Sequence, residues 1–366
     1  MKDIGLYIHI PFCKQKCYYC DFISYSDKCN LIEKYFDTLI QEYHSYNRDF
    51  LIKTVYIGGG TPSFVESKYI KKLLSEIDLS NAEEVTIEVN PGTVNIEKLK
   101  DYKEAGINRI SIGLQATQNE ILKRIGRIHT YEEFLDTYKM ARRVGFENIN
   151  IDLMLALPEQ KIEDIQESLE KIVDLNPEHI SVYSLILEEG TVLEKKVENG
   201  ELKLPDEDTE RKMYWLVKRY LEEKGYVHYE ISNFAKNGFE AKHNMDCWKQ
   251  KEYIGLGTAA HSYMDKKRYS NKEKIEDYIN DFNNKNINEI QDKLDEEKEY
   301  MILGLRTIKG VNISEFKNKF VNNPIYLFKK ELNKLVNEGL IEIGINEIRL
   351  TDKGLDFANL VWEEFV

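Results

Sequence analysis

Cysteine is scarce in this chain, which has five cysteines among 366 residues. So few thiols in so long a chain argue against a disulfide framework, which is typical of short secreted domains. The chain also lacks an apolar run long enough to span a bilayer, and residues 1–5 lack the charged-then-apolar layout of a signal peptide. Its net charge of −13 argues against broad electrostatic affinity for nucleic acid. We therefore expect a cytoplasmic protein whose thiols stay reduced.

Three of the five cysteines lie close together, at Cys13, Cys17 and Cys20. Thiolates at short, fixed spacings are ligands for soft metal centres. Iron–sulfur clusters usually take four cysteines, so three would leave one iron of a four-iron cluster open to a ligand that is not protein. A structural zinc site is the alternative, but it normally needs four Cys or His ligands, and Cys29 and Cys247 form no such pair.

Short, β-branched, apolar segments alternate with polar stretches of helical length in the first half of the chain. The expected strands cover residues 6–10, 55–57, 85–89, 109–114, 149–155 and 180–185, and the expected helices cover residues 31–48, 67–77, 96–105, 131–144 and 162–175. This alternation predicts an α/β fold whose parallel strands are joined by right-handed crossovers. Six such units would close part of a barrel, and a doubly wound open sheet is the alternative.

The pattern changes near residue 205. Residues 208–224 predict one long helix, 226–234 and 251–263 predict strands or loops, 271–296 predict a polar linker or exposed helices, and 297–366 predict a small winged-helix-like domain. The expected domains are therefore 1–205, 206–296 and 297–366. The recognition-like helix of the last domain mixes Lys329 and Lys330 with Glu331. This mixture favours a structural or interaction module over a DNA reader.

Polar residues stand where the expected strands end, which is where parallel α/β folds bind ligands. The second strand runs into three glycines at residues 58–60, whose backbone can approach a ligand closely. Glu88 lies between two apolar residues of the third strand and needs a partner if it is buried. Gln115 and Asp152 occupy corresponding places on the fourth and fifth strands. We expect these groups to form one site beside the cysteines.

The cysteine spacing, the glycine loop, Glu88 and Asp152 together resemble the radical S-adenosylmethionine (SAM) enzymes of the coproporphyrinogen dehydrogenase (HemN-like) branch. The resemblance implies a partial (β/α)6 barrel with a C-terminal α+β extension and a small winged-helix-like domain. It also implies a [4Fe-4S] cluster held by the three cysteines and by SAM, which an electron from the cluster cleaves to a radical, so that an electron donor is needed. The residues implied to contact SAM are Tyr7, Tyr19, Gly59, Gly60, Thr61, Glu88, Gln115, Arg127, Asp152 and His261.

Specific roles follow from the same resemblance. Gly60 and Thr61 would hold the methionine amino group of SAM, Glu88 and Arg127 would also lie at its methionine end, and Asp152 would take a ribose hydroxyl. His261 belongs to a segment that closes over the SAM pocket in that family. From the residues alone, only a convergence of polar groups is predicted.

Two departures from the dehydrogenases point to their heme-chaperone relatives, the HemW branch. Phe22 stands where the dehydrogenases have a further cysteine, and we expect no long N-terminal extension before the first strand. Residues 243–248 are similar to the HemW motif His-Asn-x-x-Tyr-Trp, with cysteine in place of the tyrosine. The heme-binding candidates are therefore His243, Cys247 and Trp248, which could offer axial ligands and an aromatic face. Alternatively, His243 caps a turn and Trp248 belongs to the core.

The leading hypothesis is a heme chaperone that keeps a cluster and SAM site and delivers heme to a respiratory heme protein at the membrane. No catalytic residue is assigned. The alternative is an oxygen-independent coproporphyrinogen III dehydrogenase, which would convert propionate side chains to vinyl groups and release carbon dioxide. A nucleic-acid-binding regulator that uses the C-terminal domain is disfavoured by the acidic net charge.

Overall fold

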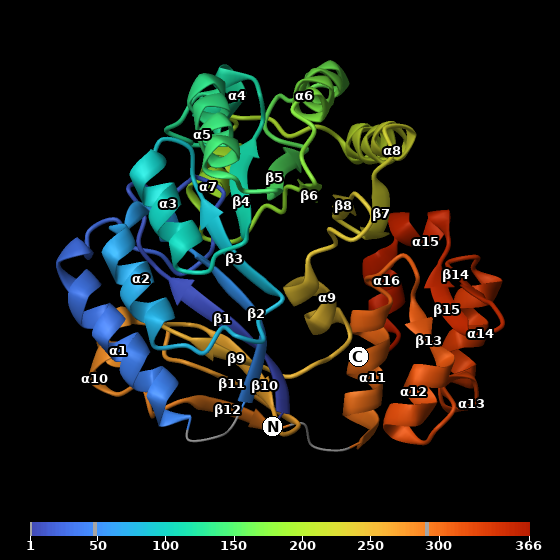
Figure 1. The fold of residues 1–366 in the computed structure, drawn as a ribbon. Coiled ribbons are helices and arrows are strands. Elements are labelled where there is room, and N and C mark those ends of the chain that lie inside the picture. Colours follow the sequence, from blue (N-terminus) through green and yellow to red (C-terminus); the bar gives the residue numbers. More distant parts are fainter. Residues whose placement is uncertain (1, 47–49, 290–292) are drawn as a thin grey trace.

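The computed structural model describes residues 2–46, 50–289 and 293–366 (Figure 1). Within these residues, the central sheet has twelve strands in the order β12-β11-β10-β9-β1-β2-β3-β4-β5-β6-β8-β7. Its parallel strands in chain order are β1 (Lys2–Ile10), β2 (Phe50–Gly59), β3 (Glu84–Val89), β4 (Arg109–Gln115), β5 (Asn148–Leu155) and β6 (His179–Ser184). All six strands predicted from the sequence are confirmed.

Helices connect these strands and cover the outside of the sheet (Figure 1). They are α1 (Ile32–Ser45), α2 (Ser67–Ser75), α3 (Ile96–Glu104), α4 (Asn119–Arg124), α5 (Tyr131–Val144) and α6 (Ile162–Asp174). The predicted end of the first helix at residue 48 lies outside the described residues. Because β1 to β6 are neighbours in chain order, right-handed crossovers place their helices on one face, and the sheet curls into a partial barrel. A doubly wound sheet would reverse its strand order at a switch point, and β1 to β6 show no such reversal. The doubly wound alternative is therefore wrong.

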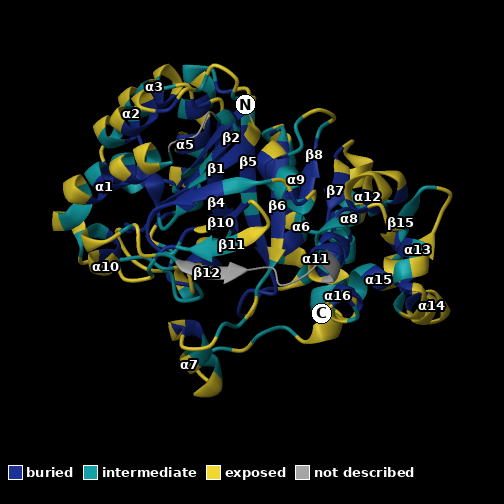
Figure 2. Ribbon diagram, turned by 90° about the horizontal axis from the view of Figure 1, so that it is seen from below, coloured by how far each residue is buried: buried dark blue, intermediate teal, exposed yellow. Residues whose placement is uncertain are grey.

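Local sequence explains where these elements begin and end. Helix α5 begins after Thr130, whose side chain and that of Glu133 form a capping box, and it ends at Gly145 with φ of 92°. Helix α2 buries Ile70, Leu73 and Leu74 at helical spacing. Figure 2 shows the consequence, with buried strands inside and helices exposed on their outer faces.

The segment after β6 extends both edges of the barrel sheet. Its elements are α7 (Val192–Glu198), α8 (Glu207–Glu223), β7 (Val227–Glu230), β8 (Asn233–Ala235), α9 (Lys242–Trp248), β9 (Tyr253–Leu256), β10 (His261–Met264), β11 (Lys267–Ser270), α10 (Ile275–Asn280) and β12 (Asn286–Glu289). Strand β8 pairs antiparallel with β6, and β9 pairs parallel with β1. The side chains of Met213 and Ile254 join the barrel core.

For the polar stretch at residues 271–296 a linker or exposed helices were expected, and the linker alternative is wrong over its described part. Ile275 and Tyr278 of α10 are fully buried, and β12 pairs with β11. The polar sequence hides this packing because its partner, the buried carboxylate of Glu42, lies far away in the chain; the Tyr278 hydroxyl donates a hydrogen bond of 2.7 Å to it. Residues 290–292 of the expected linker lie outside the described residues.

The C-terminal part has a hydrophobic core of its own, formed by side chains between Tyr300 and Phe365. Its elements are α11 (Lys293–Gly304), β13 (Val311–Asn312), α12 (Ile313–Phe320), α13 (Pro324–Leu327), α14 (Lys329–Asn337), β14 (Ile341–Ile343), β15 (Glu347–Leu350), α15 (Asp352–Asp356) and α16 (Ala358–Glu363). Helices around a small sheet of order β13-β15-β14 match the winged-helix-like order predicted from the sequence. The domain boundaries at 205 and 296 stay a prediction. In the described part of the chain, no helix is long and apolar enough to cross a membrane.

Candidate functional site

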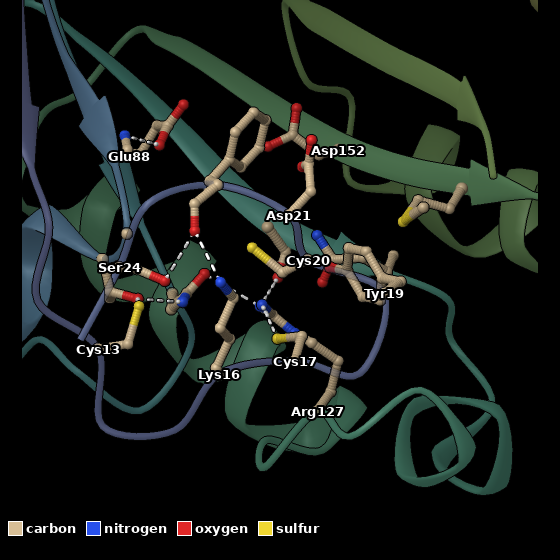
Figure 3. Close-up of a pocket in the computed structure, with 18 of the residues that line it drawn as sticks. Cys13, Lys16, Cys17, Tyr19, Cys20, Asp21, Ser24, Glu88, Arg127 and Asp152 are labelled. Carbon is tan, nitrogen blue, oxygen red and sulfur yellow. Dashed lines mark hydrogen bonds between the residues drawn. The ribbon is translucent and has the colours of Figure 1, made fainter. Parts of the chain in front are cut away.

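A cavity of about 460 Å³ opens at the carboxyl ends of the barrel strands. It is lined by most of the residues that the sequence predicts for the site, namely Cys13, Cys17, Cys20, Tyr19, Gly59, Gly60, Thr61, Glu88, Gln115, Arg127 and Asp152. Figure 3 shows the cysteines on one side of this cavity and the carboxylates of Glu88 and Asp152 on the other. The fold therefore gathers in one place groups that lie up to 139 residues apart, from Cys13 to Asp152.

The three cysteines lie on the loop that follows β1, and none forms a disulfide bond. Backbone hydrogen bonds from Cys13 to Tyr25 and from Thr61 to the Phe12 carbonyl, of 3.0 and 2.9 Å, fix the start of the loop. Desolvation raises the pKa of Cys20 to about 11, and it also raises the pKa of Cys13. Thiols with raised pKa values release their protons when iron binds them, so metal loading and thiol ionisation are coupled at this loop.

The glycine loop leaves no room for side chains. Gly59 has φ of 110°, and a Cβ atom there would lie 2.6 Å from the ring of His9. A Cβ atom on Gly60 would lie 3.0 Å from Sγ of Cys13. The backbone of this loop therefore passes directly beside Cys13, the first predicted cluster ligand, which only glycine permits.

Asn90 connects the two sides of the cysteine loop, and the sequence did not single it out. Its amide donates a hydrogen bond of 2.9 Å to Oγ1 of Thr61 and accepts one of 3.0 Å from Arg127. Thr61 and Arg127 in turn donate to the sulfur atoms of Cys13 and Cys17, each at 3.5 Å. One hydrogen-bonded chain thus runs from one predicted cluster ligand to another. An asparagine just after a buried strand, beside Pro91, was the available signal.

Two carboxylates lie in the floor of the cavity. Glu88 accepts hydrogen bonds of 2.8 Å from the Tyr56 hydroxyl and 3.2 Å from the Gly59 backbone. Asp152 accepts a hydrogen bond of 3.0 Å from the Ser111 hydroxyl. Desolvation raises the pKa of Glu88 to about 7 and also raises the pKa of Asp152. Within the described residues, neither carboxylate forms an ion pair with a lysine or arginine, and the charge of Arg109 only partly offsets their desolvation. A cationic ligand would therefore stabilise the ionised form of both.

Gln115 and Arg127 line this cavity, and each has a buried polar atom without a hydrogen-bond partner. The sheet register shifts between Gly113 and Gln115, and Gln115 has φ of 68°, a left-handed conformation that glutamine rarely adopts. Oε1 of Gln115 and Nε of Arg127 are buried without a hydrogen-bond partner. Strained backbone and unpaired polar atoms are features of ligand sites.

Two residues predicted to contact SAM do not line the cavity. Tyr7 lies one side chain behind it, where its hydroxyl makes a hydrogen bond of 2.9 Å with Nδ1 of His9 and its ring stacks on Tyr56. His261 is exposed at the start of β10 and lies outside the set of lining residues. The predicted SAM contacts of Tyr7 and His261 stay predictions.

The heme-binding candidates lie together on α9, outside the cavity. The buried ring of His243 stacks on Tyr56 at 5.6 Å and makes a hydrogen bond of 2.9 Å with Thr54, and desolvation lowers its pKa to about 4. Desolvation likewise raises the pKa of the Cys247 thiol to about 12. The ring of Trp248 lies 4.5 Å from the Arg306 guanidinium. His243 is buried, whereas Cys247 and Trp248 are half-buried, and Trp248 is not part of a hydrophobic core cluster of the described residues. Both the heme-binding roles and the alternatives to them stay predictions.

The donor set of the cavity suits an iron–sulfur cluster with SAM. Three thiols provide soft ligands for iron. The unpaired atoms of Gln115 and Arg127 and the two desolvated carboxylates provide partners for the polar and cationic groups of SAM. The residues present therefore fit both groups.

Comparison with known proteins places the chain in a family. The Radical SAM superfamily matches residues 7–172, and the HemN C-terminal domain matches residues 291–357. The heme chaperone HemW of Lactococcus lactis is 40% identical over 371 residues, which cover 100% of this chain and 98% of the relative. The chain belongs to the HemW family of heme chaperones. HemW of Bacillus subtilis is 37% identical and covers 98% of each chain.

This chain shares its fold with a solved enzyme structure. Coproporphyrinogen III oxidase (HemN) of Escherichia coli, described as a radical SAM enzyme, superimposes with a TM-score of 0.86 over 99% of this chain and 89% of HemN. At 22% sequence identity, this likeness shows the fold alone. Membership of the Radical SAM superfamily implies a [4Fe-4S] cluster and SAM in HemW proteins.

Proposed function

We propose that this chain binds heme and delivers it to a respiratory heme protein, and that it keeps a working radical SAM centre. Family membership carries the proposal, because the relatives matched over the whole chain are heme chaperones. Phe22 supports it: this side chain stands in place of the further cysteine expected in dehydrogenases, and it lies 62% exposed at the cavity rim.

In this proposal Cys13, Cys17 and Cys20 hold the cluster. Gly60 and Thr61, which the glycine loop places beside Cys13, would hold the methionine amino group of SAM. Glu88 and Arg127 would lie at the methionine end, and Asp152 would accept a ribose hydroxyl. When bound, a reduced cluster supplies the electron that cleaves SAM. The chain's own part is to orient SAM and to supply charge through Glu88, whose raised pKa falls when a cation binds.

Heme binding through the α9 motif requires a rearrangement of that helix. The buried ring of His243 is stacked on Tyr56 and bonded to Thr54 through Nδ1, so Nε2 must become accessible before it can ligate iron, while the Nδ1 bond can persist. Trp248 would have to exchange its contact with Arg306 for the face of the macrocycle. Helix α9 lies between the barrel and the C-terminal domain (Figure 1), where a movement of that domain could release it.

The dehydrogenase remains the second candidate, because the whole cavity with its cysteines and carboxylates is retained. One experiment separates the two functions. The cluster is rebuilt anaerobically on pure protein, heme is titrated, and coproporphyrinogen III is supplied separately with SAM and dithionite. We expect stoichiometric heme binding and no decarboxylated product. Formation of the vinyl product would overturn the chaperone as the sole function.

Variants locate the heme and the cluster independently. His243→Ala should weaken heme binding, whereas the matched variant His44→Ala, at an exposed histidine on α1, should not. Equal heme affinity in His243→Ala and the parent would remove the motif from the proposal. Cys17→Ala should lose the cluster absorbance whether or not heme binds, which tests the cluster ligands by themselves.

A further inference from the structure

An arginine that follows α11 is held between two tryptophans. Cζ of Arg306 lies 4.5 Å from the ring centre of Trp248 on α9 and 4.7 Å from that of Trp362 on α16. Two of the three tryptophans in the whole chain thus meet on one side chain. Because Trp248 belongs to the predicted heme motif, this stack joins that motif to the C-terminal part of the chain.

Arg306 differs from the other arginines that stack on aromatic rings in the described part of the chain. Each of those arginines also forms an ion pair with a carboxylate: Arg142 with Glu178, Arg211 with Asp356, and Arg268 with Glu299. Arg306 forms no ion pair within the described residues, and its Nε atom is buried without a hydrogen-bond partner. Desolvation lowers the pKa of Arg306. The cation has therefore lost part of its hydration without gaining an anion beside it, which costs free energy.

Two further donors of the same stack are unpaired. Nε1 of Trp248 and Nε1 of Trp362 are both buried without a hydrogen-bond partner. Buried indole N–H groups usually find an acceptor, and buried donors without one are rare in folded proteins. Three unpaired N–H donors and one positive charge in a single stack are the complement of an anion with several acceptor oxygens.

Glu230 is the acidic group whose charge acts on Arg306, but it does not take the place of this anion. It is 1% exposed and accepts hydrogen bonds from the side-chain amide of Asn233 and from the Ser232 backbone. Desolvation raises the pKa of Glu230 to about 7, although the charge of Arg306 opposes this shift. The carboxyl is therefore largely uncharged below pH 7 and balances the guanidinium incompletely.

The backbone of Arg306 is fixed, whereas its side chain has room to turn. The Arg306 carbonyl accepts a hydrogen bond of 3.1 Å from the Ile231 backbone, and the Ile308 N–H donates one of 3.1 Å to the Tyr229 carbonyl. These bonds attach the segment after α11 to the turn between β7 and β8. The long, half-buried side chain can therefore change its rotamer and its partner while the backbone stays in place.

Heme carries two propionate carboxylates at one edge of its flat ring. In the proposed function Trp248 turns from Arg306 to the face of that ring, which leaves the guanidinium beside the bound heme. We infer that Arg306 binds a propionate of the heme through paired, charge-assisted hydrogen bonds, while Trp362 supports the guanidinium from its other side. This inference rests on the proposed function, because it requires heme at the α9 motif.

A carboxylate of another protein is the second source of the same chemistry. Trp248 favours the propionate, since the indole that lies on the guanidinium is itself part of the predicted heme motif. A third explanation is a stack that only fastens α9 to the C-terminal part through cation–π contacts. The three explanations differ in whether the effect of changing Arg306 depends on the carboxylates of the porphyrin.

Esterified heme separates these explanations. Heme and its dimethyl ester, which has no free carboxylate, are titrated in the same detergent into the cluster-loaded parent, Arg306→Met and Arg211→Met, and binding is followed by the Soret absorbance. Arg211 is the matched control, because it also stacks on a ring, that of Tyr214, and also reaches the C-terminal part, through Asp356.

The expected result is a loss of discrimination in one variant. The parent should bind heme at least about tenfold more tightly than the ester. Arg306→Met should bind both porphyrins with the parent's affinity for the ester, whereas Arg211→Met should keep the parent's ratio. Arg306→Lys, which keeps the charge without the planar pair of donors, should keep part of the preference and provides a second variant if Arg306→Met does not fold.

Three outcomes would overturn the inference. Equal affinity of the parent for heme and its ester would leave the guanidinium for a carboxylate of another protein. An equal loss of affinity for both porphyrins in Arg306→Met would make the stack purely structural, and an unchanged ratio in that variant would remove Arg306 from heme recognition. Failure of the proposed function gives a different result, because the parent would then bind neither porphyrin.

Discussion

Arg127 donates a hydrogen bond of 3.0 Å to the side-chain oxygen of Asn90. The same guanidinium donates to Sγ of Cys17, and the amide of Asn90 donates to Thr61, whose hydroxyl donates to Sγ of Cys13. Hydrogen bonds to cluster sulfurs are among the factors that set the reduction potential. Asn90 therefore holds two donors to the sulfurs of predicted cluster ligands, although it touches neither sulfur.

Asn90→Leu should make the cluster harder to reduce. The change removes the group that holds Thr61 and Arg127 in place, so their hydrogen bonds to sulfur weaken. A hydrogen bond worth about 1 kcal/mol corresponds to about 40 mV in a one-electron couple, and we expect a negative shift of that order. Potentiometric titration followed by electron paramagnetic resonance measures it.

A matched variant shows whether the shift is specific. Asn108→Leu removes another asparagine beside the barrel strands, at the opposite end of the barrel. Asn108 accepts a hydrogen bond of 2.8 Å from the Val85 backbone N–H. This variant should destabilise the fold and leave the potential unchanged. Equal reduction potentials in Asn90→Leu and the parent would contradict a role of the Thr61–Asn90–Arg127 hydrogen bonds in setting the potential.

SAM affinity should rise with pH because of Glu88. Its pKa is raised from 4.5 to about 7 by desolvation, so in the folded protein without ligand the carboxyl is neutral below that value. Because its pKa is raised on folding, Glu88 contributes to the stability of the folded protein fully below pH 4.5. This contribution is lost as the pH rises from 4.5 to about 7. A cationic ligand favours the ionised form, so its binding below pH 7 must release a proton.

The dissociation constant of SAM should therefore increase up to about tenfold for each pH unit below about 7. Equilibrium dialysis with cluster-loaded protein measures it between about pH 5.5 and 8. Glu88→Gln should bind more weakly and without this slope, whereas Glu133→Gln, at the cap of α5, should keep it. A flat profile in the parent would show that SAM does not engage Glu88.

The barrel was predictable because its signal is local. Each parallel strand is a short apolar run bounded by polar helices, and residues at the carboxyl ends of such strands must meet, so the sequence alone predicts Glu88 and Asp152 beside the cysteines. The packing of α10 against α1 depends on Glu42, a distant partner that no local pattern marks. The burial of His243 likewise depends on partners that are distant in the sequence, because Thr54 and Tyr56 belong to β2.

Buried histidines should make the protein acid-sensitive. Desolvation lowers the pKa of His243 from 6.5 to about 4, so the unfolded chain binds a proton more readily within that window. His243 therefore does not reduce the free energy of unfolding above about pH 6.5. Between pH 6.5 and 5 it lowers that free energy by about 2 kcal/mol, because protonation favours the unfolded chain. His228 acts in the same direction, with its pKa lowered to about 4.

His243→Gln cannot take up a proton, so it should lose less stability than the parent on acidification. Urea unfolding at about pH 7 and 5 compares the two, and the difference between pH values is the quantity of interest because the variant also loses contacts at pH 7. His44→Gln, at the exposed end of α1, should keep the parent's slope. Identical slopes in the parent and His243→Gln would mean that the ring is not held neutral by burial.

The buried carboxylate of Glu42 fixes the added strands to the barrel. It accepts hydrogen bonds of 2.9 Å from the Gly257 backbone, 2.8 Å from Asn271 and 2.7 Å from the Tyr278 hydroxyl. Lys285 also forms an ion pair with it. Breaking a buried ion pair by removing one partner costs about 3–5 kcal/mol because the other charge stays buried, so Glu42→Gln should lower the free energy of unfolding by that amount.

Removing both charges should restore part of this stability. In Glu42→Gln/Lys285→Met no buried charge is left without a partner, so a double-mutant cycle measured by urea unfolding should show a coupling of about 2 kcal/mol or more. The exposed pair Lys72–Asp37 on the barrel helices provides the control, and Lys72→Gln should cost less than about 1 kcal/mol. If Glu42→Gln were as mild as Lys72→Gln, the carboxylate would be hydrated in solution, and the strands β9 to β12 would depend instead on the apolar contacts of Ile275 and Tyr278 with the barrel core.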